Sequence, residues 1–157
     1  MRIVADEETM RFVGGVRDRD RVEASIERWL RRWENEGFGH FVVTRREDSA
    51  FLGQVGLTVW DSRTWVESSS AKAGEHAEVE MGWMLDRAAW GKGYATEAAR
   101  AVRDWAYSVG VRSIVSMIQP ENEVSARVAE KLGARPGDTI VVAGWTTVLW
   151  RHMPGGS

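Results

Sequence analysis

The chain has 157 residues, of which 43% are hydrophobic and 28% are charged, as in an ordinary globular protein. Its 21 basic and 23 acidic residues give a net charge of −2, which argues against nucleic acid or an anionic membrane as a partner. There is no cysteine, which excludes disulfides and thiolate chemistry, and the three histidines are too scattered for a metal site. Without a membrane-length apolar run or a signal-peptide core, we expect one cytoplasmic domain over residues 1–157.

The first regular element is a helix that follows an apolar-containing segment. Asp20 and Glu23 have the spacing of a capping box at its start. Gly37 has the position of a helix stop. Between them, one apolar helical face is predicted for Val22, Ile26, Trp29, Leu30 and Trp33.

A β-hairpin and a loop come next. Residues 38–46 and 51–60 alternate between apolar and polar, and the turn 47–49 separates them, which predicts two antiparallel strands. Residues 61–75 have little periodicity, so we expect a mobile surface loop there.

A strand, two glycines and a helix form the centre of the sequence. Residues 76–85 alternate with period two, and residues 95–109 have helical spacing and end before a glycine. The first turn of a helix has N–H groups without internal acceptors, and its dipole end is positive. Gly91 and Gly93 carry no side chains that would keep an anion away from these amides. This arrangement predicts an anion cradle, with a pyrophosphate as the expected ligand.

The remaining elements complete a layered α/β fold. We expect a short buried strand at 113–118, a helix at 120–133 and one or two strands at 139–142 and 145–151. The order β-β-β-α-β-α-β implies a mixed, mostly antiparallel sheet flanked by helices, whose one obligatory parallel step lies between residues 80 and 118.

Two nucleotide motifs do not fit the glycine loop. A P-loop needs a leading glycine and a hydroxyl after its lysine, and both are missing around Lys92. A dinucleotide fingerprint needs a third glycine where Thr96 stands. The loop Trp90-Gly91-Lys92-Gly93-Tyr94-Ala95 instead resembles the acyl-CoA motif of the GNAT superfamily of N-acyltransferases, with Trp90 in place of the usual Gln or Arg.

Two longer stretches extend this resemblance. Residues 80–98 are similar to the branch that includes the ribosomal-protein N-terminal acetyltransferases, and Asn122-x-x-Ser125 with Glu130-Lys131-Leu132-Gly133 matches a second segment of that branch. The resemblance implies a GNAT-like sheet. Residues 1–19 do not contain the family's usual first strand, and the sheet edge that this exposes favours a homodimer.

The resemblance also implies a binding site for acetyl-CoA. Met84 and Leu85 would offer backbone groups to the pantetheine arm, the amides of residues 91–96 would hold the pyrophosphate, and Asn122 and Ser125 would lie near the thiol. The residues assigned to the cofactor are Met84, Leu85, Trp90, Gly91, Lys92, Gly93, Tyr94, Ala95, Thr96, Asn122 and Ser125. Each side chain has a simpler alternative role: Asn122 as a helix cap, Trp90 as a packing residue and Lys92 as a solvated surface charge.

Acyl transfer from a thioester to an amine needs a base, an oxyanion site and a stabilised leaving thiolate. Glu80 is the leading candidate base, because apolar neighbours would raise its pKa toward the useful range; the alternative is a structural carboxylate in an ion pair. Glu78 and His76 are weaker candidates, for binding a substrate cation and for a base respectively. Many of these enzymes use a Tyr on the second helix as the acid. Ser125 stands in that segment here and would give a modest hydrogen-bonding effect.

These observations predict an acetyl-CoA-dependent N-acetyltransferase in which an amine attacks the thioester directly, without a metal. The acceptor would be a protein N-terminus or a small amine. One alternative is a CoA-binding sensor or scaffold that keeps the cradle without the chemistry. The other is a nucleotide-binding module, which would bind ATP or NAD as well as it binds CoA.

Overall fold

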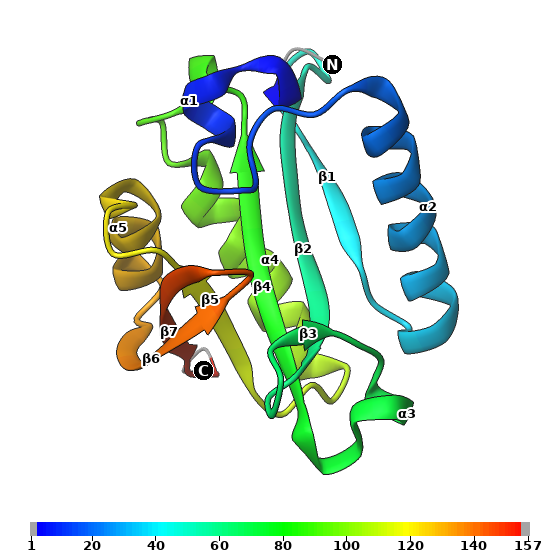
Figure 1. Cartoon of the computed structure of the whole chain (residues 1–157). Coiled ribbons are helices and arrows are strands. Elements are labelled where there is room, and N and C mark those ends of the chain that lie inside the picture. The colour runs from blue at the N-terminus through cyan, green and yellow to red at the C-terminus, as the bar shows by residue number, and fades with distance from the viewer. Residues whose placement is uncertain (1–2, 155–157) are drawn as a thin grey trace.

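A mixed β-sheet forms the middle of the molecule (Figure 1). The structure is a computed structural model that describes residues 3–154. The strand order is β1-β2-β4-β5-β7-β6, with β3 paired to β2 off this path, and each ladder is antiparallel except that between β4 and β5. The strands are β1 (His40–Thr44), β2 (Phe51–Asp61), β3 (Val66–Glu67), β4 (Ala77–Leu85), β5 (Ile114–Ile118), β6 (Arg135–Val142) and β7 (Trp145–His152). The predicted mixed, mostly antiparallel sheet is confirmed.

The part of the chain ahead of β1 is helical. From residue 3 it forms η1 (Ile3–Ala5), α1 (Glu7–Met10) and α2 (Arg19–Glu36), with no strand before His40 in the described part. Strand β1 is therefore an edge of the sheet, as expected. This edge is partly covered, because the Trp33 indole of α2 donates a hydrogen bond to the carbonyl of His40 at 3.1 Å.

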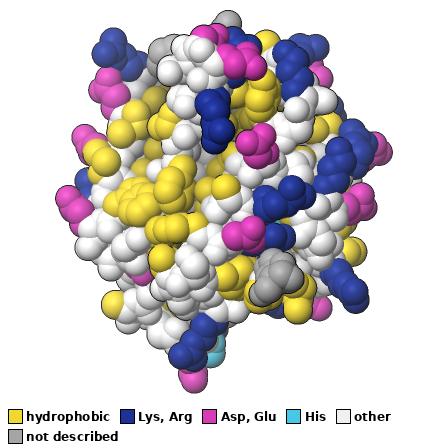
Figure 2. Space-filling view, turned by 180° about the vertical axis from the view of Figure 1, so that it is seen from behind, with side chains coloured by type: hydrophobic (Ala, Val, Ile, Leu, Met, Phe, Trp, Pro, Cys, Tyr) yellow, Lys and Arg dark blue, Asp and Glu magenta, His cyan; other side chains and the backbone are white. Residues whose placement is uncertain are grey.

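Helix α4 (Tyr94–Ser108) covers one face of the sheet and builds the main core. It lies behind β2 and β4 in Figure 1. Its buried side chains pack with those of β2, β4 and β5; this cluster includes Val55, Leu57, Val59, Met81, Ile114, Ala99, Val102 and Ala106. Odd-numbered residues of β2 and β4 thus face α4, and the even-numbered ones point to the other face. Figure 2 shows the α4 side of the molecule, with apolar side chains gathered among charged ones.

Helix α2 departs from the prediction at its start and on its buried face. Asp18, not Asp20, is the N-cap, and its carboxylate accepts from the backbone N–H of Arg21 at 2.9 Å. The predicted stop is confirmed, because Gly37 is left-handed at φ 72°. Ile26 and Leu30, predicted to be buried, are 44% and 60% exposed.

The buried face of α2 is set by tertiary contacts instead. The helix lies against the edge of the sheet, with the Trp29 ring stacked on His40 and the Trp33 ring against Phe41. The polar residues Ser25 and Arg32 are the buried ones, and Arg32 forms an ion pair with Glu67.

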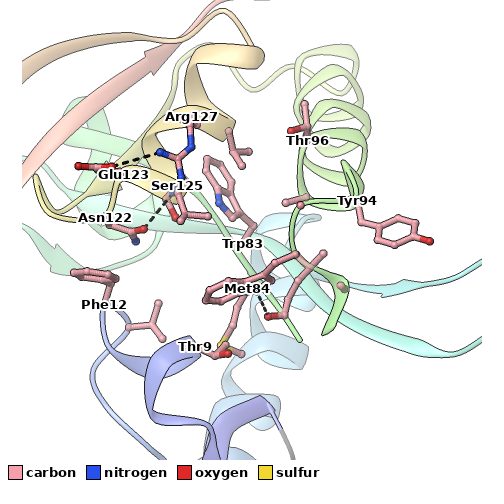
Figure 3. A pocket seen from close by; sticks show the side chains of 18 of the residues that line it. Thr9, Phe12, Trp83, Met84, Tyr94, Thr96, Asn122, Glu123, Ser125 and Arg127 are labelled. Carbon is pink, nitrogen blue, oxygen red and sulfur yellow. Dashed lines mark hydrogen bonds and ion pairs between the residues drawn. The ribbon is translucent and has the colours of Figure 1, made fainter. Parts of the chain in front are cut away.

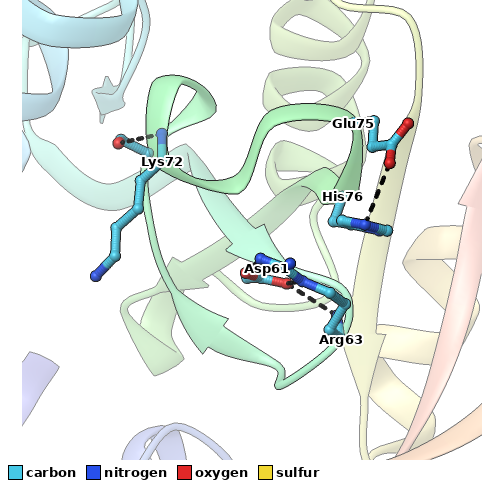
Figure 4. Close-up of polar contacts among 6 residues, drawn as sticks. Asp61, Arg63, Lys72, Glu75 and His76 are labelled. Carbon is cyan, nitrogen blue, oxygen red and sulfur yellow. Dashed lines mark hydrogen bonds and ion pairs between the residues drawn. The ribbon is translucent and has the colours of Figure 1, made fainter.

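The segment 61–75 is not the irregular loop that the sequence predicted. It contains β3, α3 (Ser70–Ala73) and the start of η2 (Gly74–His76). At its base Asp61 accepts hydrogen bonds from the Arg63 backbone and side chain at 3.0 and 2.9 Å (Figure 4). The Ser70 N–H donates to the carboxylate of Glu36 at 3.0 Å, which ties the segment to the end of α2.

The C-terminal strands are longer than predicted, because β6 begins at Arg135. Its register shifts between Pro136 and Thr139, and a proline is tolerated there because β6 is an edge strand. None of the helices between residues 3 and 154 combines the length and the apolar character needed to cross a bilayer.

Candidate active site

A cleft of about 530 Å³ opens where β4 and β5 separate. The two parallel strands pair only at Val79–Ile114 and Glu80–Val115. One residue further on, the Ser116 hydroxyl donates to the carbonyl of Met81 at 2.6 Å, so a side chain replaces the next main-chain bond. Beyond this point the strands form the two sides of an open fork, and the cleft lies at its mouth.

The register of β4 determines which main-chain groups face the fork. Neighbouring residues in an antiparallel ladder direct their N–H and C=O groups to alternate sides. The N–H of Asp86 donates to Leu52 of β2 at 2.7 Å, so even-numbered residues of β4, including Met84, bond to β2. Trp83 and Leu85 therefore point their main-chain groups toward the fork.

This register corrects the predicted roles of two residues. Met84 lines the cleft, but its main-chain groups face β2 and are not available to a ligand. The carbonyl of Leu85 accepts a hydrogen bond from the Trp90 indole at 2.9 Å. The main chain of Trp83 and the N–H of Leu85 remain on the open side. Sequence reasoning missed Trp83, which the parity of the strand register identifies.

The glycine loop leads into α4 without a side-chain cap. Gly91 and Gly93 have φ of 72° and 85°, a region that glycine adopts without the strain it imposes on other residues, and no atom lies within 4 Å of where a Cβ would stand. Gly93 is the N-cap, and its carbonyl accepts the first helical bond from Glu97 at 3.0 Å. The amides of residues 94–96 therefore have no acceptor inside the helix.

The cleft includes most of the residues that the sequence assigned to a cofactor. Those lining it are Met84, Leu85, Trp90, Gly91, Gly93, Tyr94, Ala95, Thr96, Asn122 and Ser125. Lys92 is the exception: its ammonium group donates to the carbonyl of Ala88 at 2.9 Å, on the outside of the loop.

Helix α5 (Glu123–Lys131) forms a second wall (Figure 3). Asn122 is its N-cap and accepts from the Ser125 N–H at 3.2 Å, so the alternative role as a cap is confirmed, while both residues also line the cleft. Arg127 and Lys131 bring positive charge to the same wall, and Arg127 pairs with Glu123 at 3.5 Å.

The N-terminal segment forms the wall across from α5, and its residues show no periodic pattern that predicts this position. Thr9, Phe12 and Val13 line the cleft there, and Figure 3 shows Thr9 and Phe12 across the opening from α5. An ion pair of 2.7 Å between Glu8 and Arg87 joins this segment to the chain that follows β4. A group that enters the cleft therefore lies between α1, β4 and α5.

Glu80 lies outside the cleft, on the even-numbered face of β4. It pairs across the strands with Thr58, and its side chain bends over Gly82, where an added Cβ would lie 2.9 Å from Oε1. Burial raises the pKa of Glu80 to about 8, and Arg32 opposes this rise. At neutral pH the carboxyl is therefore mostly protonated, and it becomes an available base as the pH approaches 8.

The two weaker candidates have other contacts. Glu78 accepts from the Ser113 hydroxyl at 2.7 Å and lies 3.6 Å from Arg151, so it is held in a structural network. His76 ends η2 and contacts the exposed Glu75 at 3.5 Å, far along β4 from the fork (Figure 4). Across residues 3–154 no group of three or more His, Cys, Asp or Glu side chains could hold a metal ion.

Known proteins resemble this chain in sequence. Residues 1–135 match the family described as acetyltransferase (GNAT) domain. Among curated relatives, protein YkkB of Bacillus subtilis is 29% identical over 136 residues, which cover 86% of this chain and 73% of that protein.

Solved structures give the same result. An acetyltransferase from Agrobacterium tumefaciens aligns with a TM-score of 0.77 and 26% identity, over 96% of this chain and 81% of that one. The structure of yncA from Salmonella typhimurium with its cofactor acetyl-CoA aligns with a TM-score of 0.62 at 18% identity, over 84% and 72% of the two chains. The chain, whose first 135 residues match the family, belongs to the GNAT acetyltransferases.

Proposed function

We propose that the protein transfers the acetyl group of acetyl-CoA to a primary amine by direct attack in a ternary complex. One observation carries the proposal: the fork between β4 and β5 leads directly to the uncapped amides of residues 94–96. An anion at a helix N-terminus is stabilised both by free N–H groups and by the helix dipole. Family membership and the acetyl-CoA held by a protein of the same fold support acetyl-CoA as the co-substrate.

The cofactor would extend from the helix start into the fork. The amides of residues 91–96 would bind the pyrophosphate, and the open main-chain groups of Trp83 and Leu85 would pair with the pantetheine amides. Arg127 and Lys131 supply positive charge on the α5 wall, where further phosphate oxygens can be neutralised. The thioester would then lie between the end of β4 and the start of α5.

Proton removal from the acceptor is assigned to Glu80. An ammonium ion must lose a proton before it can attack, and a carboxylate with a pKa of about 8 is a strong enough base to accept it. Because Glu80 does not line the cleft, we propose that the proton passes through water that enters with the acceptor from the even-numbered face of β4. The attacking nitrogen forms a bond to the thioester carbon, the C–S bond breaks, and the thiolate departs.

Ser125 is proposed to stabilise the departing thiolate. Its backbone N–H is used by Asn122, but it lines the cleft at the start of α5. A hydroxyl donor contributes less than a true acid would, on the order of tenfold to a hundredfold in rate.

The acceptor is proposed to be a protein N-terminus, with small amines as the second choice. Residues 80–98 resemble the ribosomal-protein N-terminal acetyltransferases, which supports the first choice. Release of free thiol from acetyl-CoA, measured with a panel of short peptides, polyamines and aminoglycosides, tests both. We expect turnover with peptides, and a strong loss near neutral pH in Glu80→Gln with acetyl-CoA binding unchanged. Equal turnover in that variant would refute the role of Glu80.

A CoA-binding sensor remains the second candidate, because α5 contains no tyrosine and Glu80 lies outside the cleft. A sensor predicts that acetyl-CoA raises the melting temperature while no amine in the panel releases thiol. A nucleotide-binding module predicts that ATP or NAD stabilises the protein as much as acetyl-CoA does.

A further inference from the structure

An ion pair between the buried Arg32 and the half-exposed Glu67 lies on the even-numbered face of the sheet, on the side of α2. Arg32 comes from the C-terminal part of α2, and its side chain is only 7% exposed. Its partner is Glu67 of the two-residue strand β3, and no other hydrogen bond of the Arg32 side chain is found among the described residues. Burial of a guanidinium is costly, so a fold that keeps one at this position needs a compensating partner.

The strand register brings this pair beside Glu80. Trp60 of β2 has Glu67 as its cross-strand partner on one side and Glu78 of β4 on the other. Glu80 pairs with Thr58, one step along the same face. Residues two apart along a strand share a face at about 7 Å, which places Glu80 next to the Trp60–Glu67 row.

The charges around Glu80 act on it in opposite directions. Arg32 favours the ionised carboxylate and lowers the pKa of Glu80, whereas the negative charge of Glu67 raises it. The Trp60 indole also lowers this pKa, although its buried Nε1 makes no hydrogen bond of normal geometry among the described residues. From β1, His40 is neutral at physiological pH, because burial and Arg32 lower its pKa to about 3. On β4 itself, the Glu78 carboxylate accepts a hydrogen bond from Ser113, which directly precedes β5, and pairs with Arg151 of β7.

We propose that Arg32 and Glu67 form one positioning unit, which sets the charge environment of the Glu80 carboxyl group for proton abstraction. The inference rests on the proposed function. Strand β3 then has a definite purpose, because its pairing with β2 delivers Glu67 to the Arg32 guanidinium above Trp60. Arg32 is buried on the inward side of α2 for the same reason.

Opposite pH shifts test the proposal. The measurement is kcat/KM for thiol release as a function of pH, with the best acceptor of the panel. Loss of the positive charge in Arg32→Gln should move the Glu80 limb of the profile to higher pH, and loss of the negative charge in Glu67→Gln should move it to lower pH. Each shift is expected to be on the order of one pH unit. Arg32→Lys, which keeps the charge, should restore most of the wild-type profile.

Arg31→Gln is the matched control, because Arg31 is a neighbour on the same helix with a 59% exposed side chain. Its profile should equal that of the wild type. If Arg32→Gln is too unstable to assay, ¹³C NMR can follow the titration of the Glu80 carboxyl carbon in Glu67→Gln and in the wild type. This measurement gives the shift in the Glu80 titration midpoint without the need for turnover. If the Glu80 limb of the pH profile lies at the wild-type position in both Arg32→Gln and Glu67→Gln, the inference is overturned while the proposed function stands. A profile whose limb survives in Glu80→Gln, or an absence of turnover with every amine, would overturn the proposed function and this inference with it.

Discussion

Gly82 provides the sharpest test of the position of Glu80. An alanine methyl group at residue 82 would stand 2.9 Å from Glu80 Oε1, while the other atoms of that carboxyl group lie at 3.7 Å. The φ of Gly82 is not in the left-handed region, so Gly82→Ala imposes no backbone strain. The contact is relieved if the end of one flexible side chain moves by about half an ångström. Alanine is favoured over glycine in a strand by roughly 0.5–1 kcal/mol, so the variant should be as stable as the wild type or slightly more so.

Catalysis should respond differently from stability. A misplacement of about 1 Å costs roughly a hundredfold in rate, so a shift of half that size should lower kcat about tenfold. The assay is steady-state thiol release, with acetyl-CoA affinity and urea unfolding measured on the same sample. Gly137→Ala is the matched control, because its added methyl group would meet only the carbonyl of Leu149 at an ordinary 3.4 Å. A folded Gly82→Ala enzyme with wild-type kcat would refute the placement of Glu80 as the base.

Three other variants test separate parts of the site. Gly93→Ala forces a left-handed φ of 85° on alanine and puts a methyl group into the space proposed for the pyrophosphate. The variant should lose about 1–2 kcal/mol of unfolding free energy, and its affinity for acetyl-CoA, measured by calorimetry, should fall at least tenfold. An unchanged Kd would contradict the proposed pyrophosphate site. Gly56→Ala would place a methyl group against the His40 ring, and because that ring is stacked on Trp29 the variant should lose about 1–3 kcal/mol of stability in urea unfolding. Wild-type stability would show that the ring moves freely. Glu80→Gln should be more stable than the wild type at pH 8.5 and equal to it near pH 4.5. Because the Glu80 pKa is raised to about 8 in the folded state, the folded protein holds a proton that the unfolded chain has already lost, and wild-type stability falls by at most about 5 kcal/mol as the pH rises through this window. A fall of the same size in the variant would assign the effect to another group.

Local patterns in the sequence predicted the elements that bury an apolar face. The strand 76–85 and the helix 95–109 were expected within a residue or two of β4 and α4, because their apolar residues follow a single period. The glycine loop was equally predictable, since the positive φ values of Gly91 and Gly93 favour glycine and a glycine N-cap offers no side-chain cap.

Features that depend on partners distant in sequence were not predictable. Two aspartates, at positions 18 and 20, could each cap α2, and the choice depends on how the preceding chain enters the helix. The buried face of α2 follows from the pairing of Arg32 with Glu67, 35 residues away, and no periodicity reveals a buried charge. The ladder between β4 and β2 determines which β4 residues direct their main-chain groups toward the fork. The strand was predicted correctly, but the prediction that Met84 offers its main chain to the cofactor was wrong for this reason.

The hydroxyl of Ser116 has a consequence for how quickly a thioester can enter. Its hydrogen is given to Met81, so the 2.9 Å contact with His152 requires the ring to donate from Nε2, and this fixes the tautomer of a buried histidine whose pKa is lowered to about 4. The two strands are thus joined at the base of the fork by a neutral hydrogen-bonded group that does not titrate near physiological pH. Because the strands already diverge beyond this group and the cleft is open without a ligand, we expect association of acetyl-CoA to follow simple second-order kinetics. No first-order opening step should set a ceiling on the observed rate.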